Sequence, residues 1–216
     1  MKKVAVSVAA LSAALALSGC GRIVGSFIPP QTVSNPAGLE GKQLVASSPL
    51  AIEAVVGTVS YSTAGAPFDD ITIPELPLNI KPTGLEFKTG FAKVDVNGLC
   101  AKPQQVNLTV RRVKLEASDA VTKASFDSGA DRDLASFTLT KKSEGVGTAE
   151  YNVSAGTLSV AAPDAGTVVN FFTVLTSGGK NTASVEAKIR ATQNELAGCT
   201  MAFTLKDVSV VLSQFQ

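Results

Sequence analysis

Three aspartates in one short loop are the residues whose type and spacing first suggest chemistry. Asp127, Asp131 and Asp133 lie close together in the chain, with Gly129 between the first two. Carboxylate oxygens are the ligands that a hard cation such as calcium prefers, and glycine gives a loop the freedom to gather them. However, Arg132 stands among the carboxylates, and their spacing is not that of an EF-hand loop. The loop is a candidate calcium site, and an acidic turn exposed to solvent is the favoured interpretation.

Two short motifs raise the question of a serine nucleophile. Ser177-Gly178-Gly179-Lys180 and Lys88-Thr89-Gly90 resemble the S-x-x-K and K-T-G elements of penicillin-recognising serine enzymes. In such a site the lysine lowers the barrier to deprotonation of the serine. Here the motifs occur in the opposite order, and the first lies in a glycine-rich turn rather than at the start of a helix. The sequence also lacks an S-D-N element, so we expect a chance match and assign no catalytic residue.

The residue types that the chain lacks exclude further classes of function. It has no histidine, which rules out Ser-His-Asp and Cys-His catalysis and imidazole-bound zinc, copper or iron. It has no tryptophan and only 2 tyrosines, so aromatic platforms for stacking sugars or bases are nearly excluded. Basic and acidic residues number 19 and 18, which leaves no electrostatic footprint for nucleic acid. We expect a protein that is not an enzyme and that uses no cofactor.

The amino terminus carries the most specific signal. Lys2 and Lys3 precede an uncharged apolar run, 4–17, which is too short to span a bilayer and fits the core of an export signal. The next residues, Leu17-Ser18-Gly19-Cys20, resemble the lipobox of bacterial lipoproteins. This resemblance implies cleavage after Gly19 and acylation of Cys20, and more than one acyl chain would hold the protein stably on a membrane.

The same resemblance suggests where the protein resides. Residue 21 is glycine rather than the aspartate that marks inner-membrane retention in enteric bacteria. We therefore expect a lipid-anchored protein of the cell envelope, on the outer membrane if the host has one.

The remaining cysteines, Cys100 and Cys199, form an even pair in a chain expected to be exported, which predicts a disulfide. Their phase supports the bond. Cys100 continues the apolar even positions that include Val96, and Cys199 begins the apolar odd series that continues with Met201. Two separate buried thiols are the alternative.

The pattern of apolar residues divides the chain into a leader (1–19), an acylated tether (20–49) and one domain (50–216). Prolines and glycines interrupt any period in the tether and predict a flexible linker. From residue 50 onward apolar and polar residues alternate, which is typical of strands with one buried face. The alternation is clearest at Ala183, Val185, Ala187, Ile189 and Ala191. With turn signals such as Asn97-Gly98, this predicts an all-β domain, either an antiparallel β-sandwich or an open barrel.

Two predicted strands change their apolar parity partway along. The apolar positions switch from even to odd across Arg111-Arg112, and from odd to even across Lys206-Asp207. Because side chains alternate strictly along a strand, a β-bulge at each place would restore the register.

A short helix is expected only in 118–126, capped by Ser118 or Asp119. Phe171-Phe172 are interpreted as neighbours on a strand, so that one ring points away from a one-sided core. That ring would contact a second core layer or line an apolar groove for a lipid or protein partner. Lys141-Lys142 and Arg111-Arg112 are interpreted as exposed strand positions, with a contact to lipid headgroups or a polysaccharide as the alternative.

These observations favour a non-enzymatic envelope lipoprotein that acts as a structural or protein-interaction module. Its expected contacts are the membrane, through acylated Cys20, and another envelope protein, through an apolar or loop-borne surface. The alternative is a carrier that binds a lipid or another apolar ligand between β-sheets, with room left by the alanines of 183–191. An enzyme using carboxylates or a Ser-Lys pair is the third and least favoured hypothesis.

Overall fold

The computed structural model describes residues 28–47, 59–63, 80–118, 121–129, 132–175, 182–191 and 196–216. In these ranges the chain is mostly antiparallel β-sheet, which confirms the predicted all-β class. The export leader, Cys20, Asp131 and the motif 177–180 lie outside the described residues. Within the described ranges, no helix has the length and apolar character needed to cross a membrane.

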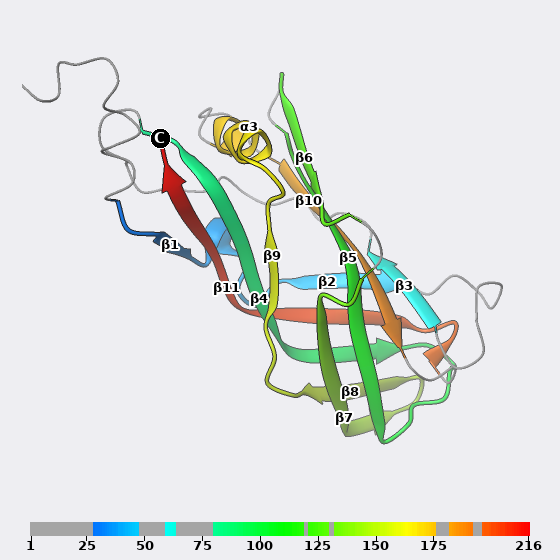
Figure 1. Cartoon of the computed structure of the whole chain (residues 1–216). Coiled ribbons are helices and arrows are strands. Elements are labelled where there is room, and N and C mark those ends of the chain that lie inside the picture. The colour runs from blue at the N-terminus through cyan, green and yellow to red at the C-terminus, as the bar shows by residue number, and fades with distance from the viewer. Residues whose placement is uncertain are drawn as a thin grey trace, which may run out of the picture.

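Three long strands run through the molecule and the shorter ones pair along them (Figure 1). The long strands are β4 (Pro82–Asn97), β5 (Gln105–Ser118) and β11 (Thr200–Phe215). The shorter strands are β1 (Gln31–Ser34), β2 (Gln43–Ser47), β3 (Val59–Thr63), β6 (Lys123–Asp127), β7 (Ala135–Gly145), β8 (Thr148–Val153), β9 (Leu158–Ala161) and β10 (Thr182–Ala191). A 3-10 helix, η1 (Pro36–Gly38), and an α-helix, α3 (Ala165–Leu175), lie between strands.

Eight of these strands pair in a closed ring, each with the next and the last with the first. In order they are β11, β2, β3, β10, β5, β7, β8 and β4, and β4 pairs again with β11. The β2–β3 seam is short, with two residue pairs in the described ranges. The sheet is thus a barrel that this short seam holds together, which agrees with the open-barrel alternative better than with a sandwich of two separate sheets.

Side chains fill the barrel. The hydroxyl of fully buried Tyr151 donates to the carbonyl of Pro103 at 2.9 Å, and the ring of Phe91 packs against Phe137 and Phe203 with centroids 5.0 and 5.2 Å apart. The strictly alternating residues of the strands supply the rest of the core: Val94, Val96, Val106, Leu108, Leu139, Ala187, Ile189, Ala191, Met201 and Leu205.

The predicted change of register in β5 is present. Ile189 of β10 pairs with Val110, whereas the preceding residue of β10 pairs with Arg112, so Arg111 is the extra residue of a bulge. Val110 before the bulge and Val113 after it are both buried. The bulge therefore keeps one apolar face toward the core although the sequence changes parity.

The second predicted change of register, in β11, is also present. Lys206 pairs with Gly90 and Ser209 with Lys88, and Asp207 between them has a φ of 53°. The carboxylate of Glu40, which follows η1, accepts hydrogen bonds from the backbone N–H groups of Asp207 and Val208 at 3.1 and 3.2 Å. A side chain far away in the sequence thus satisfies the two amide groups that the bulge removes from the ladder.

Part of the segment expected to be tether belongs to this fold. Residues of β1 pair with 209–212 of β11, and residues of β2 pair with 200–204. Leu39 and Leu44 are buried in the core. The prediction of a flexible linker is therefore wrong for 31–47, because its few apolar residues find partners on β11 that local composition does not reveal.

The helix is the main difference from the sequence-based expectation. The helix predicted in 118–126 is absent from its described part, where β6 pairs with β5 instead and buries Ala124 and Phe126. Conversely, α3 contains Phe171-Phe172, which were assigned to a strand. Its start is fixed by Asp164, whose carboxylate accepts hydrogen bonds from the backbone N–H and the hydroxyl of Thr167 at 2.8 and 2.9 Å.

The two ends of the molecule differ in construction. We call the end with the β4–β5 and β7–β8 connections the barrel end, and the opposite end, with α3, β1, β6 and β9, the helix end (Figure 1). At the helix end α3 packs against β4, β5 and β6, and its buried residues Val168, Phe171 and Val174 are spaced as one helix face.

Candidate functional site

A disulfide and a network of hydrogen bonds fix the loop between β4 and β5 at the barrel end. The sulfur atoms of Cys100 and Cys199 lie at bonding distance and their Cα atoms are 5.7 Å apart, which supports the predicted pairing. Lys102 donates from Nζ to the carbonyls of Gly98 and Cys100 at 2.7 and 3.0 Å. The Nζ of Lys141 donates in turn to the carbonyl of Lys102 at 2.6 Å.

The residue at 98 must be small for this loop to form. Gly98 has a φ of 134°, and a Cβ placed there would lie 2.8 Å from Sγ of Cys199. Its N–H donates to the carbonyl of Gly147 at 2.9 Å, so the loop is joined to the turn between β7 and β8. The two connections therefore form one rigid unit.

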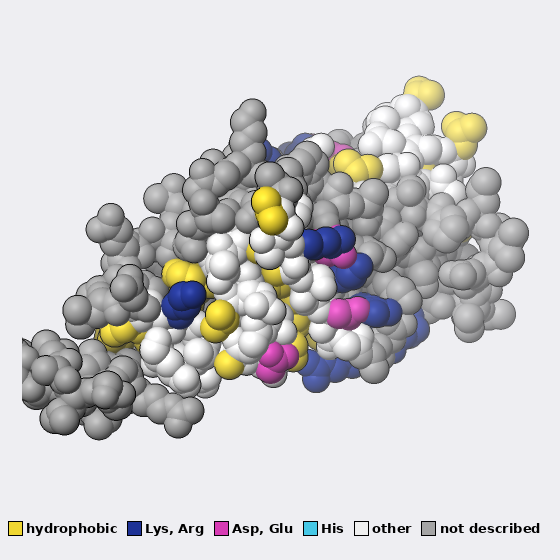
Figure 2. All heavy atoms as spheres, turned by 90° about the horizontal axis from the view of Figure 1, so that it is seen from above, with side chains coloured by type: hydrophobic (Ala, Val, Ile, Leu, Met, Phe, Trp, Pro, Cys, Tyr) yellow, Lys and Arg dark blue, Asp and Glu magenta, His cyan; other side chains and the backbone are white. Residues whose placement is uncertain are grey.

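This rigid unit exposes two aliphatic side chains. Leu99 is 99% exposed and Val146 is 102% exposed, and the residues next to them are joined by the Gly98–Gly147 hydrogen bond. We call Leu99 and Val146 the apolar tip. Figure 2 shows hydrophobic side chains standing out from the surface at the end of the molecule away from α3. Such exposure costs solvation free energy without helping the fold, and it commonly marks a contact site.

A polar hollow of about 420 Å³ lies on the outer surface beside the tip. It crosses β2, β11, β4, β8 and β7, and its lining residues are Gln43, Asp95, Asn97, Ser143, Gly145, Thr148, Ala149, Glu150 and Ala202. Gly145 and Ala202, which lie on the outward face, have little or no side chain, and their small size leaves the surface concave between longer polar neighbours.

The charges of the hollow form a connected network. Nζ of Lys93 lies 3.0 Å from a carboxylate oxygen of Asp95 and 3.4 Å from one of Glu150. Lys142 lies 2.5 Å from the other oxygen of Glu150, and Gln43 donates to Asp95 at 3.2 Å. The hydrogen bond from Lys142, aided by Lys93, lowers the pKa of Glu150, and the hydrogen bond to Asp95 raises the pKa of Lys93. Both groups therefore stay charged near neutral pH, and their charges cancel.

Among the described core residues, the cavity that is seen is much smaller. A cavity of about 20 Å³ lies at the level of the two bulges, lined by apolar side chains of several strands and by Thr89. The Thr89 hydroxyl lies within hydrogen-bond distance of the carbonyls of Gly90 and Lys206, at 3.0 and 3.3 Å. A cavity of this size accommodates about one water molecule. Ala187, one of the alanines expected to leave room for a ligand, contributes to close packing in this structure.

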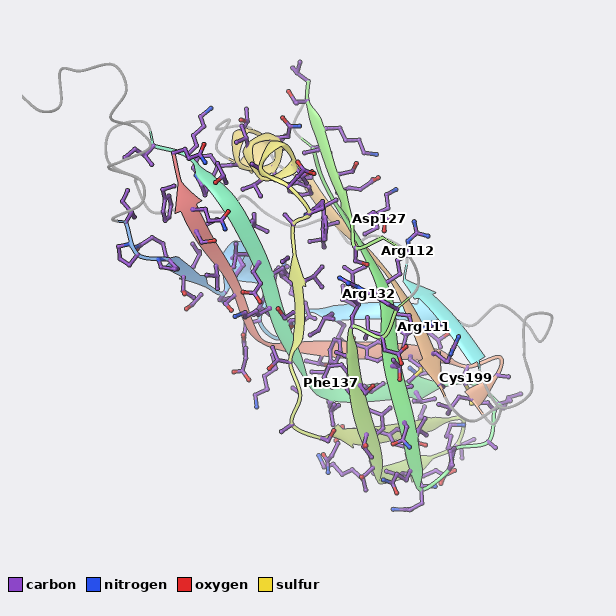
Figure 3. The ribbon with its side chains drawn as sticks, viewed as in Figure 1. Arg111, Arg112, Asp127, Arg132, Phe137 and Cys199 are labelled. Atoms are coloured by element: carbon purple, nitrogen blue, oxygen red, sulfur yellow. A yellow bond between two sulfur atoms is a disulfide. The ribbon has the colours of Figure 1, made fainter. Side chains whose placement is uncertain are left out.

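Two of the three aspartates singled out for calcium, Asp127 and Asp133, are engaged by arginines. Arg112 forms a two-pronged ion pair with Asp127 (Figure 3). Arg111 donates to a carboxylate oxygen of Asp133 at 3.1 Å. The Arg112 guanidinium lowers the pKa of Asp127 to about 2, aided by the N–H of Gly129. In the described residues, no three His, Cys, Asp or Glu side chains are placed to hold a metal ion. Asp127 ends β6 and Asp133 lies in the loop that follows, and both are partners of the arginines at the β5 bulge.

The K-T-G tripeptide has a structural role in β4. Lys88 pairs with Glu86 at 3.1 Å on the outer face, and Thr89 is buried opposite the β11 bulge. Its proposed serine partner lies outside the described residues. Of the two interpretations of Phe171-Phe172, the second core layer is confirmed, because Phe171 is buried and Phe172 packs against the cluster of Ile80, Leu212 and Phe215.

Sequence reasoning did not single out the apolar tip or the hollow. A signal for the tip was available, because Leu99 follows the turn pair Asn97-Gly98 and Val146 stands between two glycines, where polar residues are usual. The hollow has no comparable local signal, because five strands contribute to it. No protein-family model matches the chain, and no curated protein is significantly similar to it.

Proposed function

We propose that this protein is a non-enzymatic lipoprotein of the cell envelope that acts as a protein-interaction module. The observation that carries the proposal is the apolar tip: Leu99 and Val146 are fully exposed on connections that a disulfide and several hydrogen bonds hold still. A rigid surface loses little conformational entropy when it binds, so its apolar side chains can contribute fully to affinity.

The membrane anchor of the proposal rests on the lipobox. With Cys20 acylated, residues 21–30 would join the lipid to β1, and β1 pairs with β11 at the helix end. Leu212, the partner of Gln31, and Thr200 at the barrel end are 12 positions apart on β11, or about 40 Å along a strand. In this arrangement the apolar tip lies away from the anchor and is available to a partner beyond the anchoring leaflet.

Photocrosslinking in the native cells tests the interaction. A photoreactive benzoylphenylalanine at position 99 is expected to give a discrete protein adduct, and the same group at exposed Ser125 of β6 serves as the control. If position 99 gives no protein adduct, the interaction module is rejected. Mass spectrometry of the amino-terminal peptide tests the anchor separately: Cys20→Ser should abolish both the lipid and the retention on membranes.

The carrier of an apolar ligand, the alternative predicted from the sequence, has less support. Ligand pockets commonly enclose about 300–1,000 Å³, far more than the cavity of about 20 Å³ between described core residues. A carrier would have to open its barrel or move α3 before a lipid could enter. An organic extract of the purified protein that contains a stoichiometric lipid would restore this function.

A further inference from the structure

The polar hollow is built from rows of residues that face outward in register. Ala202 of β11 pairs with Val45 of β2 on one side and with Asp95 of β4 on the other. Asp95 pairs with Glu150 of β8, and Glu150 pairs with Ser143 of β7. One row of outward side chains therefore crosses five neighbouring strands, with Ala202 as a low point between exposed Val45 on β2 and polar groups on β4, β8 and β7.

This surface continues directly into the apolar tip. The next row toward the barrel end contains Asn97, which pairs with Thr148, and both residues line the hollow. Gly98 and Leu99 follow Asn97, whereas Val146 and Gly147 precede Thr148. The hollow and the tip thus share one rigid framework, and a partner that covers the tip would overhang the hollow.

The hollow and the apolar tip differ in chemistry, and together they limit the kind of partner that can bind both. The tip offers aliphatic surface, which favours a partner with an apolar patch. The hollow offers amides, hydroxyls and ion pairs whose charges cancel, which favours hydrogen-bonding groups without strong net charge. Apolar anchors beside a polar, hydrogen-bonding margin are the usual anatomy of a protein–protein interface.

We propose that the hollow and the apolar tip are two halves of one docking surface for a protein. The occupant presents an apolar patch to Leu99 and Val146 and inserts a polar segment of low net charge between Gln43 and Ser143. This inference rests on the proposed interaction function and adds to it the location and chemistry of the contact. A glycan fits the tip poorly because it has little apolar surface, and a bilayer fits the hollow poorly because a concave surface whose charges cancel does not attract anionic headgroups.

The test uses the full-length protein in its native cells. Benzoylphenylalanine is placed at Leu99 in the tip, at exposed Gln43 on the rim of the hollow, or at Ser125 on β6 as a control. Positions 99 and 43 are expected to give adducts of the same mass and the same protein identity, and position 125 is expected to give neither.

A second substitution tests whether the hollow is occupied. Ser143→Arg fills it and adds a charge, whereas Ser125→Arg makes the same change at an exposed strand position elsewhere. In the protein with the photoreactive group at 99, Ser143→Arg should lower the adduct yield about tenfold, because an unmatched charge within an interface is costly, and Ser125→Arg should leave it unchanged. Equal urea-unfolding midpoints of the two arginine variants exclude misfolding as the cause.

The outcomes separate this inference from the proposed function. An adduct at 99 that Ser143→Arg leaves unchanged, with none at 43, overturns the shared surface and retains the interaction module. Absence of protein adducts at both positions overturns both. Adducts of position 43 with glycan or lipid overturn the assignment of a protein occupant.

Discussion

The barrel end and the helix end are built on the same three long strands, but their cores are closed in different ways. At the barrel end the sheet closes, and the disulfide between Cys100 and Cys199 joins the β4–β5 loop to the start of β11. At the helix end the strands separate, and apolar side chains of α3 cover the gap between β4 and the β5–β6 pair. The boundary between the two ends runs through the bulges at Arg111 and Asp207.

The exposed apolar residues of the two ends differ in how firmly the backbone beneath them is held. Leu99 and Val146 stand on the end where the backbone is most constrained, so their exposure follows from a rigid local structure. Val121, in the turn between β5 and β6, is also exposed, but it lies at the helix end beside residues outside the described ranges. Exposure on a constrained backbone therefore distinguishes the apolar tip from Val121, and it is the basis of the proposed contact.

Removing the disulfide should produce the largest loss of stability. The Cys100→Ser, Cys199→Ser double variant should lower the free energy of unfolding by about 4 kcal/mol, because the bridge closes a loop of residues 99 positions apart. Urea unfolding followed by circular dichroism measures the change, with Ser143→Ala as a control for substitution in the same region. An unchanged midpoint would show that the bridge does not constrain the unfolded chain.

At the helix end, truncation of one ring should have the next largest effect. Phe171→Ala should cost about 3 kcal/mol, because Phe171 is buried beneath α3 and its removal leaves a cavity. Hydrogen exchange should accelerate in α3 and β6 more than in β7 and β8. The exposed neighbour Thr173→Ala is the control, and equal acceleration at both ends would contradict the division of the molecule.

The bulge of β11 depends on one distant carboxylate. Glu40→Ala removes the acceptor of the Asp207 and Val208 amides and should cost about 1 kcal/mol, since the bonds are charge-assisted but partly exposed. Thermal unfolding measures the loss, and exposed Glu144→Ala provides a comparison. A stability equal to that of wild type would mean that water replaces Glu40 without cost.

The β5 bulge should show a small dependence on pH. Arg112 lowers the pKa of Asp127 to about 2, below its unfolded value of about 4. Ionised Asp127 therefore stabilises the fold above about pH 4, and this contribution disappears as the pH falls toward 2. Because the pair is partly exposed, we expect less than about 1 kcal/mol. The difference in unfolding free energy between wild type and Asp127→Asn should shrink over this range, and a constant difference would contradict the assignment.

The apolar tip should contribute almost nothing to folding. The Leu99→Ser, Val146→Ser double variant should change the free energy of unfolding by less than about 0.5 kcal/mol, because both side chains are fully exposed. Crosslinking from position 43 should nevertheless fall, since the partner loses its apolar anchors. A marked loss of stability would assign the tip a structural role and remove the main support for the proposed function.

Much of the sheet was predictable because strand periodicity is local. Val110 and Val113 fall on opposite parities, and only an extra residue at Arg111 can bury both, as the pairing with β10 shows. The same reasoning located the β11 bulge and the phase of the two cysteines. The helix was missed because 165–175 is apolar enough to be read with either period, and because its cap, Asp164, stands in the sequence Pro163-Asp164-Ala165-Gly166, which is typical of a turn.

The amino-acid sequence by itself determined the apolar alternation of β4, β5, β10 and β11, the two changes of register and the pairing of the cysteines, because alternation and residue chemistry act over a few neighbouring positions. Only the tertiary structure decided that 31–47 joins the sheet, that Glu40 satisfies the bulge at Asp207, and that small residues of β7 and β11 leave a hollow beside Leu99 and Val146. Those features depend on burial and contact between segments far apart in the chain. The local sequence does not indicate which distant segment a residue will contact.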